Sequence, residues 1–573
     1  MSKLNTLNPK RILQYVLASC WVMWVVIQYL GYRPNYLTLF YDHPYSGYLS
    51  MIALLSAGLG AYSYFTLKKR KKWVFSLRPW WLIVLGLMIS TSVLVAFRAS
   101  NNLNITPVAT ASVYFWFHSL FYLGSLLILG LSLAGLGQFV YARLTVHKPS
   151  SMVALAIGFS LLGFYAVLLG LAGLLTSWTL WPILLLTVFF QRVYIWELVQ
   201  TWLLRPFQWR IYHWWQPVVA FIGLLLIATY WLGSLKAFPV GFDGAALYAN
   251  LSHLTAEQQA LPASNQAFAW SVVMSWGELL FGSISLSLLL SHFMYLPAGL
   301  LLYQIFRYWL KPSYALAAIV VTLSTTMWSF HAMVDEKVDL GFLFICLSIV
   351  YLLIDLFKAV KNTALTEKIT QDPTLRTLLV VVWLSGFAFS IKYTAIFLLA
   401  AWIAMFFYRF GKGRLLAFWL FFFLGFLFIS GFHSWGNIPI ENNSEAQILG
   451  GTFLLVGVVF LISGLLKDRS WIKQVVFSLV FAGFAFSIAY APWGGKHLAE
   501  NKFEWSINNV LFGNPEKIPL YIPNELLSYE RRNNQSPRDF QFKLTSGQDD
   551  QVGSGPLTRE ERQARRRRNI EEI

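Results

Sequence analysis

The chain has 573 residues, of which 57% are apolar and only 12% charged, and it contains 25 Trp and 47 Phe residues. A soluble globular protein needs far more polar surface than this composition supplies, so the composition predicts an integral membrane protein. The formal net charge of +18 does not indicate a nucleic-acid partner, because the basic residues of membrane proteins collect in cytoplasmic loops. We therefore expect membrane lipids as partners and no nucleic acid.

The apolar runs predict an all-α, polytopic transmembrane helical protein with about 15 spans, since each run approaches the roughly 20 residues that a bilayer requires. In chain order the runs lie at 11–31, 49–67, 79–98, 113–140, 151–176, 178–198, 217–236, 283–306, 314–333, 339–357, 377–391, 393–409, 415–432, 447–466 and 474–491. The first run is long and no small-residue cleavage site follows it, so it does not fit a cleaved signal peptide.

The distribution of Lys and Arg orients these spans. With a cytoplasmic N-terminus and alternating loops, 26 basic residues fall in cytoplasmic loops and 5 in loops on the opposite side. The five are Arg33, Arg98, Lys236, Lys337 and Lys392. This asymmetry follows the positive-inside rule and places the loop after the seventh run outside the cytoplasm. The other 13 lie in the tail 491–573, whose side the rule leaves open.

Three regions follow from these patterns. Residues 1–204 hold six spans that are poor in acids, and we expect them to act as a scaffold, to dock a lipid carrier or to contact a protein partner. Residues 205–495 form a second membrane module. Residues 496–573 form a hydrophilic tail, and its end, 530–573, is rich in Gln, Asn, Ser, Gly and charge, a composition typical of disorder.

Residues 239–282 are the loop around which the second module is organised. Asp243 is the first acid after Glu197, and a carboxylate where the chain leaves the membrane core is expected at the interface or in a wet cavity. The spaced apolar residues of the loop predict two short helices along the membrane surface. These residues are Leu247, Leu251 and Leu254 in the first piece and Trp270, Val273 and Trp276 in the second.

The pattern Phe242-Asp243-x-x-x-Leu247-Tyr248-x-x-Leu251 resembles the first extracytoplasmic loop of the type C glycosyltransferases. These polytopic enzymes take a sugar from a polyprenyl-phosphate carrier, and they include protein mannosyltransferases and aminoarabinose transferases. In that superfamily an aspartate follows the first helix of the catalytic module and juxtamembrane helices come next. The resemblance implies a catalytic role for Asp243 and covers about residues 205–495.

Two later stretches resemble the same superfamily in their position at the outer face. The first is a charged cluster between two spans, formed by His331, Asp335, Glu336, Lys337 and Asp339. The second is the segment 386–394, GFAFSIKYT, which is similar to a glycine-to-lysine-tyrosine-threonine segment of these enzymes. Such a density of charge at a membrane boundary indicates function.

The chemistry gives each residue type a role. Transfer from a polyprenyl phosphate breaks the bond between the anomeric carbon and the phosphate, so the protein must activate an acceptor hydroxyl and hold the phosphate. A carboxylate serves as general base, which we assign to Asp243. Cationic side chains stabilise the departing phosphate, and the candidates are Lys337, Lys392 and His331. The remaining acids, Asp335, Glu336 and Asp339, position the acceptor or the sugar, or bind a divalent cation.

Each assignment has an alternative that needs no catalysis. Asp243 could cap a helix that begins at Gly244, the charged cluster could pair its own charges at the membrane surface, and Lys392 could reach to the interface. His253, His292, His433 and His497 lack ligand spacing, and Cys20 and Cys346 fall inside predicted spans, so neither a histidine metal site nor a disulfide framework follows. The polyprenyl-phosphate sugar is the expected donor substrate. Apart from the divalent cation considered above, the sequence points to no cofactor.

The sequence thus predicts a membrane glycosyltransferase that transfers a sugar from a polyprenyl-phosphate donor to an acceptor on the extracytoplasmic face. The alternatives are a lipid-linked saccharide transporter or flippase, and a non-catalytic membrane scaffold with the same fold. The acids gather on one face, which favours the enzyme over a transporter. The last residues, Asn569 to Ile573, carry no endoplasmic-reticulum retention signal, which favours a bacterial plasma membrane.

Overall fold

The fold is given by a computed structural model, which describes residues 45–70, 73–100, 108–145, 149–235, 247–264, 266–333, 337–362, 373–429, 443–467 and 472–513. Within these residues the chain is mostly helical, which confirms the predicted helical class. The first expected span, 11–31, and the tail end, 530–573, lie outside the described residues.

The first part of the chain contributes six α-helices and one short π-helix to the described structure. They are α3 (Tyr45–Arg70), α4 (Pro79–Ser100), α5 (Val108–Leu144), α6 (Ser151–Leu171), α7 (Ser177–Phe190), α8 (Arg192–Val199) and η1 (Gln200–Leu204). The side-chain hydroxyl of Thr179 accepts a hydrogen bond from the N–H of Thr176 at the start of α7 (3.1 Å), so this helix start is capped.

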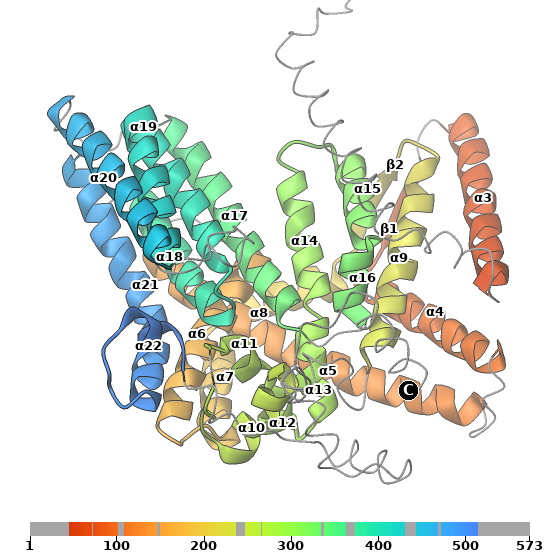
Figure 1. Cartoon of the computed structure of the whole chain (residues 1–573). Helices are drawn as coiled ribbons and strands as arrows, with labels where there is room; N and C mark the ends of the chain where they lie inside the picture. The colour runs from red at the N-terminus through yellow and green to blue at the C-terminus, as the bar shows by residue number, and fades with distance from the viewer. Residues whose placement is uncertain are drawn as a thin grey trace, which may run out of the picture.

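The second part begins with α9 and continues through short helices into longer ones. They are α9 (Trp215–Ser234), α10 (Ala249–Gln258), α11 (Ala269–Met274), α12 (Trp276–Phe281), α13 (Ile284–His292), α14 (Tyr295–Phe306), α15 (Pro312–Leu323), α16 (Thr326–Met333), α17 (Asp339–Asn362), α18 (Pro373–Ile391), α19 (Ala395–Ile429), α20 (Asn443–Lys467), α21 (Ile472–Glu500) and α22 (Ile507–Leu511). Figure 1 shows α10, α12 and α13 together below the long helices.

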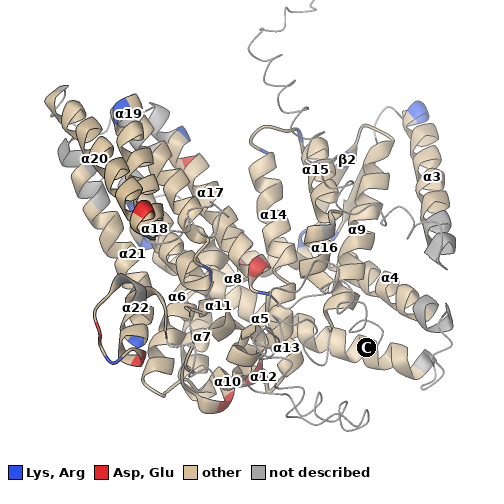
Figure 2. Cartoon of the chain, in the orientation of Figure 1, with Lys and Arg blue, Asp and Glu red and all other residues tan. Residues whose placement is uncertain are grey.

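Six helical segments of the described residues are long and apolar enough to cross a membrane, and up to eight if each of two bent helix pairs forms one span. The six are Thr110–Leu144, Ser151–Leu171, Trp215–Ser234, Ile284–Phe306, Asp339–Lys358 and Ser444–Gly464. The bent pairs are α7 with α8 and η1, at 83°, and α15 with α16, at 69°. Figure 2 shows long stretches of α5, α9 and α14 without charge.

The chain is therefore a multi-pass helical membrane protein, but the expected count of about 15 spans is not shown. Part of the difference comes from short helices. The apolar segments Pro79–Val95 and Arg376–Ile391 lie at expected spans but are shorter than the candidate spans. An apolar run in a sequence marks burial or lipid contact, and it does not by itself distinguish a full span from a short buried helix.

Helix α19 (Ala395–Ile429) folds back on itself. A straight helix would separate Phe397 and Phe423 by about 39 Å, yet their ring centroids are 6.4 Å apart. The indole N–H of Trp419 also donates to the carbonyl of Ala400 (2.8 Å). The two arms, Ala395–Met405 and Gly413–Ile429, correspond to the separate runs 393–409 and 415–432 in the sequence.

The described halves of the chain share one hydrophobic core. Helices α5 and α6 approach closely at Gly158, where an added Cβ would lie 1.9 Å from the carbonyl oxygen of Leu133; small residues permit such approach between membrane helices. From α6, Phe159 stacks on Trp276 with ring centroids 6.0 Å apart. Side chains on both sides of the expected boundary at residue 204 thus pack together, and the boundary itself stays a prediction.

One antiparallel ribbon departs from the all-α prediction. Strand β1 (Trp73–Leu77) pairs with β2 (Phe207–Ile211), joining the segment before α4 to the segment before α9. Both strands are rich in aromatic and branched residues, which favour extended structure. They are only five residues long each, so a search for apolar runs of spanning length does not find them.

Candidate functional site

The candidate site begins with an ion pair at the ends of two helices. Asp339 opens α17, and Lys392 directly follows α18. The Lys392 Nζ lies 2.6 Å from Oδ1 of Asp339, with the two side chains 33% and 24% exposed. A carboxylate is favoured in the first turn of a helix. Because both side chains remain partly open, Lys392 can exchange this carboxylate for an anionic ligand at low cost.

Helix α13 holds the backbone on both sides of the segment that leads to this pair. The imidazole Nδ1–H of His292 donates to the carbonyl of His331 (2.9 Å), and the hydroxyl of Ser291 donates to the carbonyl of Lys337. The side chains of His331 and Lys337 are half-buried. The structure therefore brings His331, Lys337, Asp339 and Lys392, four of the predicted site residues, to one end of the helices α16–α18.

Three other predicted residues, Asp243, Asp335 and Glu336, lie outside the described residues. The roles assigned to all seven residues stay predictions. In the part of the chain that the structure describes, no group of three or more His, Cys, Asp or Glu side chains is placed to hold a metal ion.

The two helices predicted in the loop 239–282 fall at α10 and at the pair α11 and α12, so the second is divided into two short helices. Trp270, Val273 and Trp276 are fully buried, and a position along the membrane surface stays a prediction. Imidazole Nδ1 of His253 on α10 lies 2.5 Å from a carboxylate oxygen of Glu278 on α12, with the side chains 18% and 13% exposed. Opposite charges this close hold two elements together once His253 is protonated, and a hydrogen bond does so when it is neutral. Sequence analysis singled out neither partner for a structural role.

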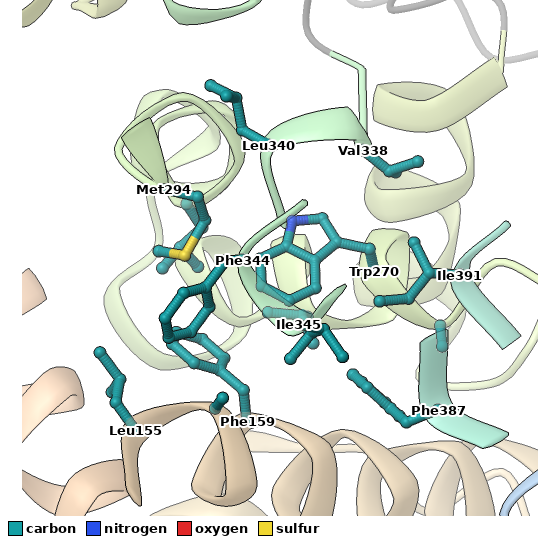
Figure 3. Close-up of a cluster of buried hydrophobic side chains, with 14 of the residues drawn as sticks. Leu155, Phe159, Trp270, Met294, Val338, Leu340, Phe344, Ile345, Phe387 and Ile391 are labelled. Atoms are coloured by element: carbon teal, nitrogen blue, oxygen red, sulfur yellow. The ribbon is translucent and has the colours of Figure 1, made fainter. Parts of the chain in front are cut away.

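Trp270 fixes α11 to the start of α17. Its indole is fully buried, and it fills the space beside Gly341, where an added Cβ would lie 2.0 Å from the ring. Figure 3 shows the indole in the middle of apolar side chains that include Val338, Leu340 and Ile391. These residues flank Asp339 and Lys392 in the sequence, so the loop helices sit directly against the segment that carries the ion pair.

The hydroxyl of Tyr393, next to Lys392, ties three segments together. It accepts a hydrogen bond from the N–H of Ala267 (3.3 Å), donates to the carbonyl of Leu511 and lies 3.2 Å from the hydroxyl of Tyr490. The loop before α11, the turn after α18 and the short helix α22 therefore meet beside the ion pair.

A second polar cluster, which sequence analysis missed, lies at the end of α21. The ammonium of Lys496 contacts a carboxylate oxygen of Glu500 and donates to the hydroxyl of Ser264 (3.1 Å). The side chains of Lys496 and Glu500 are only 6% and 13% exposed. The signal in the sequence is a Lys four residues before a Glu just after the expected span 474–491, a spacing that pairs charges on one helical face.

Burial sets the charges of this cluster, which lies beyond the last expected span. Removal from water lowers the pKa of the Lys496 ammonium, and the contact with Glu500 opposes this shift. Burial, followed by the charge of Lys496, lowers the pKa of His497 to about 4. His497 is therefore neutral at pH 7, and its Nδ1–H donates to the carbonyl of Val510 (3.2 Å).

These contacts also place the start of the tail. Ser264 and Ala267 precede α11, and they bond Lys496 and Tyr393 respectively. The residues from Lys496 to Gly513 therefore lie on the same face of the molecule as the loop helices α10–α12. The distribution of basic residues left this side open.

Comparison of the chain with protein-family models, with curated proteins and with solved structures finds no match.

Proposed function

We propose that the chain is a membrane glycosyltransferase of the type C kind, which transfers one sugar from a polyprenyl-phosphate donor to an acceptor on the extracytoplasmic face. The observation that carries the proposal is the partly exposed ion pair of Lys392 with Asp339, 2.6 Å apart, beside the helices of the loop 239–282. Ionisable side chains at the ends of apolar membrane helices often belong to a binding or catalytic site. An anionic donor with an apolar tail fits a cation at that position.

The orientation is supported by the charge distribution. The loops that contain Lys337 and Lys392 belong to the side with 5 basic residues, against 26 on the other side. The positive-inside rule then places the ion pair and the loop helices outside the cytoplasm. The segment from Lys496 to Gly513 follows them because it bonds to the same loop. We propose a bacterial plasma membrane as the location.

The proposed reaction uses these residues as follows. The oxygen of the acceptor hydroxyl forms a bond to the anomeric carbon while the bond from that carbon to the phosphate oxygen breaks. Asp243 takes the proton of the hydroxyl as general base. Lys392 leaves Asp339 and stabilises the negative charge on the departing polyprenyl phosphate. Lys337 and His331 contribute to the stabilisation of the same charge. The acids Asp335, Glu336 and Asp339 position the acceptor or the sugar, or bind a divalent cation.

The test is transfer or hydrolysis of a panel of radiolabelled polyprenyl-phosphate sugars by the purified full-length protein. The Asp243→Asn variant should lose about a hundredfold or more of the rate, as removal of a general base does. Lys392→Met should lose a similar factor, because it removes the charge that meets the departing phosphate.

Helix α17 supplies matched controls at its other end. Asp355 accepts a hydrogen bond from the Tyr308 hydroxyl, and Lys358 Nζ lies 3.5 Å from the centroid of the Tyr308 ring. Asp355 is about 24 Å along the helix from Asp339. Asp355→Asn and Lys358→Met should therefore keep the activity at equal folded yield. Turnover of no donor, or an equal loss in the control variants, would exclude the proposed reaction.

A further inference from the structure

The ribbon of β1 and β2 has one apolar face and one polar face. In an antiparallel pair, directly opposed residues point to the same side and alternate residues share a face. The register places Trp73, Phe75 and Leu77 on one face with Ile211, Trp209 and Phe207. The other face carries Val74 and Ser76 with Arg210 and Gln208.

The apolar face is covered at one end and open toward the other. Ile211 is buried, and Trp73 packs against Tyr62 of α3 with ring centroids 5.8 Å apart. Further along, Phe75 and Phe207 are each 40% exposed. An exposed aromatic face on a membrane protein is typical of the interface between headgroups and acyl chains.

The charged residues next to the two strands in the sequence have a single sign. No acidic residue occurs between Asp42 and Glu197 or between Glu197 and Asp243. The basic residues beside the two strands are Lys68, Lys69, Arg70, Lys71, Lys72, Arg78, Arg205 and Arg210. Such a basic cluster attracts anionic lipid headgroups, and each cation strengthens the attraction about fivefold near a charged membrane surface.

The covered end of the ribbon is anchored at the starts of two helices. The side-chain oxygen of Gln216 accepts from the N–H of Tyr212 (2.7 Å), and its amide donates to the hydroxyl of Ser313. Gln216 belongs to the first turn of α9 and Ser313 to that of α15. By the distribution of basic residues both starts face the cytoplasm, so the ribbon lies at the level of the cytoplasmic leaflet.

The backbone of the ribbon gives a second constraint on depth. The described sheet has only these two strands, so each strand has an outer edge of N–H and C=O groups without a strand partner. Such edges are not tolerated in the hydrocarbon core, where no water is available to bond them. The headgroup layer supplies water and phosphate oxygens, and it is the one depth that suits both the edges and the aromatic face.

We propose that the β1–β2 ribbon is a binding site for anionic phospholipids of the cytoplasmic leaflet. The aromatic face lies against the upper acyl chains, and the surrounding cations, with Arg210 on the opposite face, bind the lipid phosphates. This lipid-binding proposal does not depend on the proposed glycosyltransferase reaction, and its test does not use that reaction.

The test measures lipid binding to the delipidated full-length protein in neutral detergent. Phosphatidylglycerol and phosphatidylcholine are titrated, and bound lipid is counted by native mass spectrometry. We expect tighter binding of phosphatidylglycerol. The double variant Arg205→Gln, Arg210→Gln should weaken it on the order of twentyfold, from two lost cations. The variant Phe75→Ser, Phe207→Ser keeps every charge and should weaken binding by about tenfold through lost apolar contact.

The control is Arg143→Gln with Arg414→Gln, which removes two exposed cations, one at the end of α5 and one in the second arm of α19, and leaves the ribbon and the basic residues beside it unchanged. It should change the affinity by less than about threefold, since it lacks the second, apolar component of the site. Equal affinities for the ribbon variants and this control would overturn the proposal. Displacement of the lipid by millimolar inorganic phosphate would overturn it too, because the site would then recognise a free anion.

Discussion

Separating the buried ion pair of Lys496 and Glu500 should strongly destabilise the protein. In Lys496→Met the carboxylate of Glu500, 13% exposed, is left without its cation. It then remains charged in a dry site or takes a proton. Either state is unfavourable, because a buried charge without its partner is poorly compensated. We therefore expect a loss of about 3 to 4 kcal/mol, within the range for broken buried pairs.

The same reasoning applies to the partner and sets the result for the double variant. In Glu500→Leu the buried ammonium of Lys496 is left without its carboxylate, at a similar cost of about 3 to 4 kcal/mol. With both changes no buried charge remains, so Lys496→Met, Glu500→Leu should be more stable than either single variant. Replacement of a buried pair by apolar residues is often neutral. The coupling energy should exceed about 2 kcal/mol.

The assay is unfolding of the purified protein by denaturant, followed as loss of helical signal, for the wild type, both single variants and the double variant. Exposed charges on the following residues provide the controls. Lys502→Met and Glu504→Gln alter side chains on the exposed turn after α21 and should change stability by less than about 0.5 kcal/mol. If the two single losses simply add in the double variant, the pair is not coupled and the reasoning fails.

Three further predictions concern packing, pH and topology. Gly158→Ala should lower the melting temperature, because its Cβ would lie 1.9 Å from the carbonyl oxygen of Leu133. Such overpacking lowers the free energy of unfolding by about 1–3 kcal/mol. The control Gly130→Ala should leave the melting temperature unchanged, because an added Cβ there meets nothing within 4 Å. The folded pKa of His497, about 4, lies below its unfolded value of about 6.5. The contribution of neutral His497 to the free energy of unfolding is therefore present above pH 6.5 and is lost as pH falls toward 4. The variant His497→Gln should flatten this part of the curve of stability against pH. In a Cys20→Ala, Cys346→Ala background, the pair Phe397→Cys, Phe423→Cys should be joined by a short thiol cross-linker, as only a folded-back α19 allows. A mass spectrum without the cross-link would contradict the hairpin.

At the candidate site, local sequence patterns predict the position of the charges but not their pairing. The sequence places Lys337, Asp339 and Lys392 at the ends of apolar runs on one face, because charges avoid the membrane core and loops alternate across it. It does not predict that Asp339 pairs with Lys392 across 53 positions. That contact depends on how α17 and α18 pack, and packing is decided by side chains from many segments.

The cluster around Lys496 lay beyond sequence reasoning for the same reason. The i, i+4 spacing of Lys496 and Glu500 allows a surface pair on any helix. What makes it a buried cluster is Ser264, which comes 232 positions earlier, and the backbone of α22. The reversal of α19 is a second example. The sequence predicts the two apolar runs, but it does not predict that they contact each other through Phe397 and Phe423.

The sequence by itself determined that this is a helical, multi-pass membrane protein and where its charges gather, because the bilayer acts on each segment separately through hydropathy and charge. Only the tertiary structure decided which of the described apolar runs form helices long enough to cross a membrane, that β1 and β2 form a ribbon, and that the loop before α11, the turn after Lys392 and the start of the tail meet. Those features depend on contacts between residues far apart in the chain, whose free energy comes from packing and paired polar groups that no single segment contains.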